Sequence, residues 1–200
     1  GGGHAHAGAM IYLGGVWPQR YCGKLFMNNI HGARLNEDRL TPHGSGYVGD
    51  GEPDFCFAND SWSQFISLAY GPDGQVTVID WYDRNQCHHH DSKTHDRGNG
   101  RIFKILYGNS VHVPVNLSVH SDTKLVELLL HNNEWFVRHA RRLLQERFVK
   151  GSLAQETPSL LQKALAAATS TRTRLRALWG MHAVGISSDD VLLEILSDAD

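Results

Sequence analysis

The sequence predicts an α+β protein of two parts, a β-rich part that ends near residue 108 and a helical part from about residue 122 onward. Seventeen of the twenty glycines lie in residues 1–108, where short apolar runs alternate with Gly, Pro, Asn and Asp. After residue 121 the chain is rich in Leu, Ala and Arg at helical spacing. The polar, Pro-containing residues 109–121 are expected to link the two parts.

Apolar runs rich in β-branched and aromatic residues predict five β-strands, at residues 9–15, 23–30, 64–71, 75–82 and 100–108. A Pro-Asp-Gly turn precedes the fourth run, and its alternation puts Val76, Val78 and Asp80 on one face. The segments 33–59 and 83–99 are expected to be long loops that carry binding groups, because such groups are usually held on loops above a rigid frame.

The second part predicts pairs of helices repeated every 35–40 residues or so, a spacing that is typical of HEAT-type solenoids. The apolar faces of the first pair are expected to pack together, with Leu125, Leu128 and Leu129 on one helix and Val137, Ala140, Leu144 and Phe148 on the next. Arg138, Arg141 and Arg142 lie mostly on the opposite side of the second helix. We interpret them as a solvated helix face, and an anion-binding patch is the alternative.

Composition excludes several classes of protein. The 19 basic and 21 acidic residues give none of the strong positive charge of a nucleic-acid binder, so no nucleic-acid partner is expected. No apolar run approaches the ~20 residues that a membrane span needs. Cys22, Cys56 and Cys87 contain no C-x-x-C pair and are expected to be separate thiols. The sequence begins without Met and ends within a helical pattern, so we expect a fragment of a longer protein.

The stretch VIDWYDRNQCHHHD places a cysteine and three histidines directly after a predicted strand. Haem attachment at this motif is excluded, because a c-type haem needs C-x-x-C-H and the residue three positions before Cys87 is Arg84. On extended backbone His88 and His90 would face the same way and could bind a metal ion with help from another ligand. A polar, solvated histidine loop is the alternative reading of the same residues.

A resemblance to a known family covers nearly the whole chain. It is carried in order by GGGHAHAGAMIYLGGVWPQRYCGKLFMNNIHGARLNEDRL, GSGYVG, PDFCFANDSW, YGPDGQVTVIDWYDRNQCHHHD, NGRIFKI and WFVRHARRLLQER. Together these motifs resemble the large membrane-bound dehydrogenases of planctomycetes and verrucomicrobia. The resemblance implies that residues 1–108 are the last blades of a glucose/sorbosone-dehydrogenase-like β-propeller, that 109–121 are a linker, and that 122–200 are incomplete HEAT repeats. It further implies a periplasmic or cell-envelope location and a c-type haem domain beyond this chain.

The resemblance also implies a set of site residues. Related soluble sugar dehydrogenases hold pyrroloquinoline quinone with calcium in the propeller, where a histidine acts as base and arginines bind the quinone carboxylates. Here His6 and His31 become the candidate catalytic residues, Arg34 and Asp80 the candidate cofactor-binding residues, and His88 and His90 the candidate metal ligands. His31 stands where those enzymes tend to carry a basic quinone clamp, and an imidazole cannot make the two-pronged contact of a guanidinium.

Two functions are therefore expected as alternatives. In the first, the parent protein is a sugar or polyol oxidoreductase that passes electrons to its haem domain, with a small carbohydrate as substrate. In the second, the propeller and the helical repeats form a non-catalytic scaffold that binds carbohydrate or protein. The fold alone does not choose between them, because propellers serve both purposes.

Overall fold

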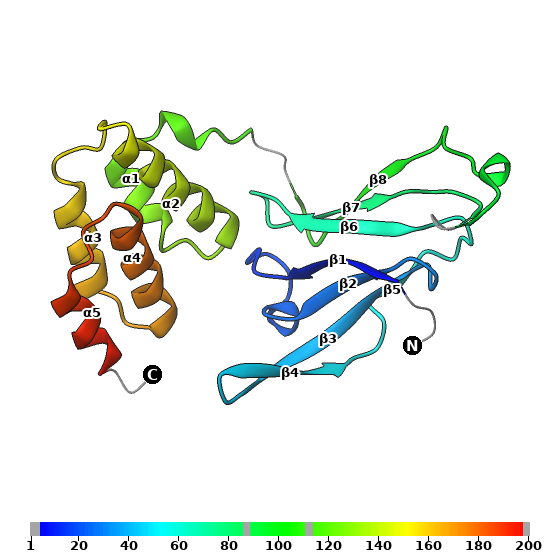
Figure 1. Ribbon diagram of the computed structural model, residues 1–200, viewed down its shortest axis with the longest axis horizontal. Helices are drawn as coiled ribbons and strands as arrows, with labels where there is room; N and C mark the ends of the chain where they lie inside the picture. The colour runs from blue at the N-terminus through cyan, green and yellow to red at the C-terminus, as the bar shows by residue number, and fades with distance from the viewer. Residues whose placement is uncertain (1–4, 86–88, 111–113, 198–200) are drawn as a thin grey trace. The chain divides into compact units, whose positions relative to one another are not determined.

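The computed structural model describes residues 5–85, 89–110 and 114–197, and the chain divides into two compact units, residues 1–113 and 114–200 (Figure 1). The described residues contain strands only in the first unit and α-helices only in the second. The predicted order of a β-rich part followed by a helical part is therefore confirmed.

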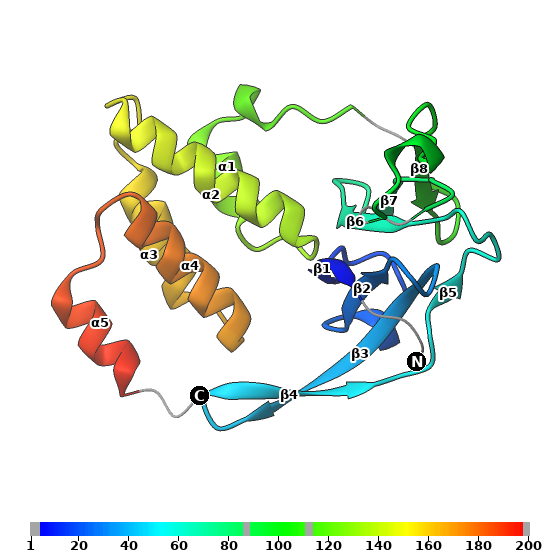
Figure 2. The ribbon, with the colours of Figure 1, turned by 45° about the vertical axis from the view of Figure 1, so that its right-hand side comes forward.

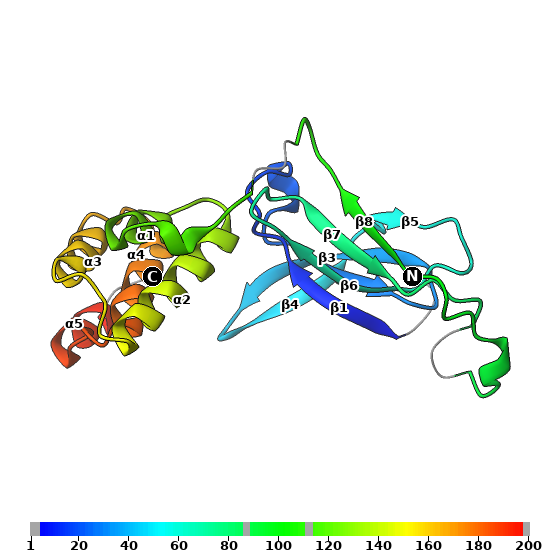
Figure 3. The ribbon, with the colours of Figure 1, turned by 90° about the horizontal axis from the view of Figure 1, so that it is seen from above.

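The first unit consists of two antiparallel sheets (Figures 1 and 3). Sheet A has the order β1–β2–β3–β4, and β5 pairs with β3 beside β4. Its strands are β1 (His6–Ile11), β2 (Leu25–Asn29), β3 (Arg34–His43), β4 (Gly46–Gly51) and β5 (Cys56–Phe57). Sheet B has the order β6–β7–β8, formed by β6 (Phe65–Tyr70), β7 (Val76–Asp80) and β8 (Arg101–Ile105). Within the described residues the sheets form neither a closed barrel nor a propeller.

The prediction of a long loop over residues 33–59 is wrong. Residues 34–51 form the hairpin β3–β4, paired from Asp38 opposite Gly51 to His43 opposite Gly46, and the turn uses Gly44 at φ +57°. Residues of both strands are polar or exposed along most of this hairpin. The hairpin therefore shows no apolar alternation, which is the sequence signal of a half-buried strand.

The two sheets meet where β1 and β2 lie against β6. Gly8 in β1 has φ +58°, and a Cβ atom there would lie 2.7 Å from the backbone oxygen of Ile66. A buried tyrosine also ties sheet A to the turn before β7, since the Tyr12 hydroxyl donates to the Gly74 carbonyl at 2.9 Å and accepts from the Trp17 amide at 2.8 Å. The expected alternation of β7 is confirmed, because Val76, Val78 and Asp80 are buried while Ile79 and Trp81 are exposed.

The second unit contains the helices α1 (Asp122–Leu128), α2 (Glu134–Val149), α3 (Thr157–Ala166), α4 (Thr171–Ala183) and α5 (Asp189–Leu196). Helices α1 and α2 pack together, as do α3 and α4, and the two pairs also contact each other (Figure 2). None of the described helices has the length and apolar character of a membrane span. Side chains of Ser121, Asn133, Ser170 and Ser188 cap α1, α2, α4 and α5 by accepting a hydrogen bond from a first-turn amide.

The predicted core of the first helix pair is largely confirmed. Leu125, Leu128, Leu129, Val137, Ala140 and Leu144 are all buried. Phe148 was expected on the same stripe but is 46% exposed. It lies in the last turn of α2, where one edge of its ring faces Gly185, so that a Cβ atom on this glycine would lie 3.0 Å from it.

Candidate functional site

Four side chains form a row across one end of sheet A. His6 on β1 is opposite Asn29 on β2, Asn29 is opposite Arg34 on β3, and Arg34 is opposite Phe57 on β5. Directly opposite residues share a face of the sheet, and Asn36 lies on the same face because it is two positions after Arg34. The strand register thus gathers two predicted site residues, His6 and Arg34, with residues that the sequence analysis did not single out.

Hydrogen bonds connect three members of this row with Asn36 and Asp54. We call these five residues the His6 relay: His6, Asn29, Arg34, Asn36 and Asp54. Arg34 Nη1 donates to Asp54 Oδ2 at 2.7 Å, and the Asn36 amide nitrogen donates to Asp54 Oδ1. The Asn36 oxygen then faces the side-chain nitrogen of Asn29 at 3.1 Å and His6 Nε2 at 3.1 Å.

The relay sets the tautomer of the neutral His6 ring. The Asp54 carboxylate can only accept, so it turns the amide nitrogen of Asn36 toward itself and leaves the Asn36 oxygen as an acceptor. Nε2 of His6 must therefore carry the proton that is donated to this oxygen. The lone pair of the neutral ring is then on Nδ1, which makes His6 able to accept a proton from a bound molecule.

A tight turn beside the row holds its central members in place. Asn29 Oδ1 accepts from the Gly32 amide at 2.8 Å, and Arg34 Nε donates to the Gly32 carbonyl at 3.1 Å. A Cβ atom on Gly32 would lie 2.8 Å from both side chains, so any other residue at this position would displace them. The predicted catalytic residue His31 is half-buried in this turn.

The surface around the relay combines polar groups with one aromatic ring. The Arg34 and Asp54 side chains are 20% and 15% exposed, so their ion pair is screened less than a fully exposed one. The Arg34 guanidinium lies 4.9 Å from the centre of the Phe57 ring, which is 53% exposed. Hydrogen-bonding groups beside an accessible ring can bind a ligand that has both hydroxyl groups and an apolar C–H face.

Asp80 is part of a different, internal network at the end of β7. Its buried carboxylate accepts hydrogen bonds from the backbone amides of Gln64 and Tyr82, from the Ser63 hydroxyl, and from both Nε and Nη2 of Arg101. The Arg101 guanidinium also stacks on Tyr82, 3.6 Å from the ring centre. In this arrangement Asp80 ties the start of β6 to β8, and its oxygens are already taken up by protein donors.

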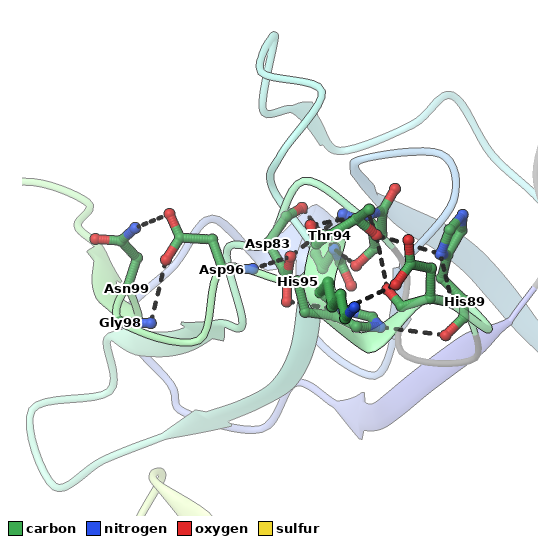
Figure 4. Close-up of polar contacts among 11 residues, drawn as sticks. Asp83, His89, Thr94, His95, Asp96, Gly98 and Asn99 are labelled. Carbon is green, nitrogen blue, oxygen red and sulfur yellow. Dashed lines mark hydrogen bonds and ion pairs between the residues drawn. The ribbon is translucent and has the colours of Figure 1, made fainter.

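The loop after β7 is organised by a second aspartate and a histidine (Figure 4). The buried Asp83 accepts from the Asp96 amide at 2.9 Å, from the Asn85 amide at 3.3 Å, and from His95 Nδ1 at 3.2 Å. Burial alone would raise the pKa of Asp83, but these three hydrogen bonds outweigh it, so the pKa is lowered. The other ring nitrogen of His95 faces the His89 carbonyl at 3.2 Å.

Of the two predicted metal ligands, only His90 lies within the described residues. His90 is exposed in the loop, and His88 lies outside the described residues. Asp83 and His95, which hold this loop together, were not expected from the sequence. A signal for them was present, since the segment from Asp83 to Asp96 is dense in residues that form hydrogen bonds with backbone amides.

The described residues do not fit a quinone held with calcium. Among them, no group of three or more His, Cys, Asp or Glu side chains could hold a metal ion. Arg34, the predicted quinone ligand, is already paired with Asp54. The Asp80 carboxylate already accepts five hydrogen bonds, and calcium requires about six to eight oxygen ligands.

Comparison with known proteins places the first unit in a family. Residues 2–109 match a family described as a domain of unknown function (DUF7133). This match covers more than half of the chain, and the chain belongs to that family. No curated protein and no solved structure matches the chain.

Proposed function

We propose that the first unit carries a binding and proton-transfer site for a sugar or polyol, as part of an oxidoreductase. The observation that carries this proposal is the His6 relay, because it fixes the proton of the neutral ring on Nε2 and leaves Nδ1 as a base. The exposed Phe57 ring and the partly buried Arg34–Asp54 pair supply the apolar and polar contacts that a polyhydroxylated ligand requires.

In the proposed reaction one substrate hydroxyl group becomes a carbonyl group. Nδ1 of His6 takes the hydroxyl proton, and the hydrogen on the same carbon leaves as hydride with two electrons. This oxidation would need a two-electron acceptor elsewhere in the parent protein to take the hydride, and the c-type haem domain expected outside this chain would supply the onward electron transfer. The role of this chain is to bind the substrate, orient His6 and take up the proton.

The finer architecture belongs to the same proposal. Sheet A follows the path of a four-stranded antiparallel meander, which is the form of a propeller blade, and sheet B has three strands of the same kind. We take the two sheets as the last blades of a propeller and the paired helices as the start of a HEAT-type solenoid. The periplasmic or envelope location, a carbohydrate substrate and the dehydrogenase identity rest on the resemblance described above.

The test is the variant His6→Gln in the full-length protein. Turnover of a panel of aldoses and polyols is measured with an artificial electron acceptor, and sugar binding is measured by calorimetry. We expect kcat to fall by about 10²–10⁴-fold, the usual contribution of a general base, while the affinity for sugar changes little. The matched control is His43→Gln, an exposed histidine at the far end of β3, and its turnover should equal that of the wild type.

A second function, a non-catalytic scaffold that binds carbohydrate or protein, is favoured by one observation. The polar side chains of the relay form hydrogen bonds with one another, and so do those of the internal network around Asp80. A scaffold would bind sugar without turning it over with any acceptor, and His6→Gln would then alter affinity alone. Equal turnover in wild type and His6→Gln would contradict the assignment of His6 as the base.

A further inference from the structure

A groove on the second unit runs between α2 and α4 and is separate from the relay. It has a volume of about 530 Å³ and is lined by Arg138, Arg141, Arg142, Gln145, Trp179, His182 and Ala183. These lining residues include three arginines and no carboxylate. The groove is closer to an open surface than to an enclosed cavity, so it does not surround a small molecule on all sides.

Helix geometry explains why these side chains gather there. The four α2 residues recur at positions i, i+3, i+4 and i+7, which puts them on one stripe, while Val137, Ala140 and Leu144 are buried on the other side of the helix. Gly180 lets α4 approach the rest of the core closely, since a Cβ atom there would lie 2.7 Å from Leu129 and 2.9 Å from Leu161. Its neighbour Trp179 is thereby held at the groove and is 45% exposed.

The charges in the groove are arranged for anionic groups. The Arg141 guanidinium lies over the Trp179 ring, 5.4 Å from its centre, and stacking of this kind leaves the N–H edge of the guanidinium available for hydrogen bonds. Arg142 forms an ion pair with Glu146 at 3.3 Å, but both side chains are well exposed, so a carboxylate from a ligand can displace this weak contact.

We propose that this groove binds an acidic peptide segment in extended conformation, with carboxylates at alternate positions. Arg138 and Arg142 are one helical turn apart, about 6 Å along the axis, and alternate residues of an extended chain are separated by about 6.6 Å. Alternate side chains point to opposite sides, so the carboxylates would face α2 while the intervening apolar residue would contact Trp179 on α4. This inference rests on the second unit alone and does not depend on the sugar site.

The probe is a fluorescently labelled peptide, acetyl-Glu-Leu-Glu-Leu-Glu, whose binding to the full-length protein is followed by anisotropy at low and moderate salt. We expect the variant with both Arg138→Gln and Arg142→Gln to bind it about tenfold more weakly or worse. Trp179→Leu should weaken binding severalfold without changing the salt dependence, and the Gln-Leu-Gln-Leu-Gln peptide should bind as poorly as the double variant. Arg172→Gln is the matched control, an exposed arginine of α4 outside the groove, and should bind as the wild type does.

Two outcomes would overturn the proposal. The first is equal binding of the Glu peptide by the wild type and by the double variant, with helical circular dichroism showing that both are folded. The second is displacement of the peptide by citrate or inorganic phosphate at equal concentration, which would make the groove a site for small anions. Arg142→Lys keeps the charge and removes the two-pronged contact, so an intermediate affinity is expected of it.

Discussion

Nε2 of His6 lies 3.1 Å from Oδ1 of Asn36, although 30 positions of sequence separate the two residues. The contact exists because β1, β2 and β3 are neighbours in sheet A and bring their polar residues to one end. Beyond Asn36, the Asp54 carboxylate and the Arg34 guanidinium fix the direction of each hydrogen bond. The ring of His6 is thus oriented by residues on two other segments of the chain.

The first prediction concerns this orientation. Asn36→Leu removes the acceptor that holds the proton of the His6 ring on Nε2, so the neutral ring should become a mixture of both tautomers. Nitrogen-15 NMR of the imidazole groups distinguishes the tautomers directly, and the exposed His43 serves as reference within the same spectrum. Unchanged His6 shifts in a folded Asn36→Leu protein would show that Asn36 does not set the tautomer.

The relay shows what the sequence alone could and could not predict about the site. His6 and Arg34 were singled out by their resemblance to a family pattern, but His6 lies before the predicted strand 9–15 and Arg34 lies in a segment that was predicted to be a loop. Asn29, Asn36 and Asp54 were missed because their importance depends on strand register and on a hairpin without apolar alternation. Only the three-dimensional pairing shows that Asn36 faces both His6 and Asp54.

The second prediction concerns the contact between the two sheets. Gly8→Ala should destabilise the first unit, because the backbone has φ +58° there and the added methyl group would lie 2.7 Å from Ile66 O and Ser67 Cα. A positive φ for a residue other than glycine costs roughly 1–2 kcal/mol, and the clash adds to it. The measurement is urea unfolding followed by tryptophan fluorescence. The control Gly100→Ala has open space around its Cβ position and should shift the midpoint little.

The third prediction concerns the helical core. Leu144→Ala should lower the free energy of unfolding of the second unit by about 2–5 kcal/mol, because the side chain is fully buried among α1, α3 and α4 residues. Thermal unfolding followed by circular dichroism at 222 nm measures it. Leu193→Ala removes the same atoms from a position that is 64% exposed and should change stability by no more than about 0.5 kcal/mol. Similar losses for both variants would show that the buried face has been misassigned.

The helical part was the easier of the two to predict, for a physical reason. A helix repeats every 3.6 residues, so Leu125, Leu129 and Leu144 reveal their buried face from local spacing. Phe148 has the same spacing, but it lies in the last turn of α2 and is 46% exposed. The spacing of apolar residues does not show where the packed part of a helix ends. The groove between α2 and α4 likewise depends on which helices become neighbours.

The fourth prediction concerns the contact between Asp83 and His95 in the histidine-rich loop after β7. Nδ1 of His95 faces the Asp83 carboxylate and Nε2 faces the His89 carbonyl, so the ring joins two parts of the loop. The variant His95→Gln keeps one donor, and we expect it to loosen the loop without unfolding the sheets. Hydrogen exchange of the Asp96 amide, which donates to Asp83, reports on this change.

The last prediction is the pH dependence that Asp83 confers. Its pKa is lower in the folded protein than the ordinary value near 3.8, so the folded state favours the carboxylate form. The stability gained from this carboxylate is complete above pH 3.8 or so, and it is lost as the pH falls through the lower folded pKa. The variant Asp83→Asn lacks this pH dependence. The free energy of unfolding of the wild type should therefore exceed that of the variant most at neutral pH, and this difference should shrink between about pH 4 and pH 2. Urea unfolding of the first unit at pH 7, 4, 3 and 2 measures it, with the exposed Asp50→Asn as the control. A difference that stays constant down to pH 2 would mean that hydrogen-bond geometry, and not ionisation, is the contribution of Asp83.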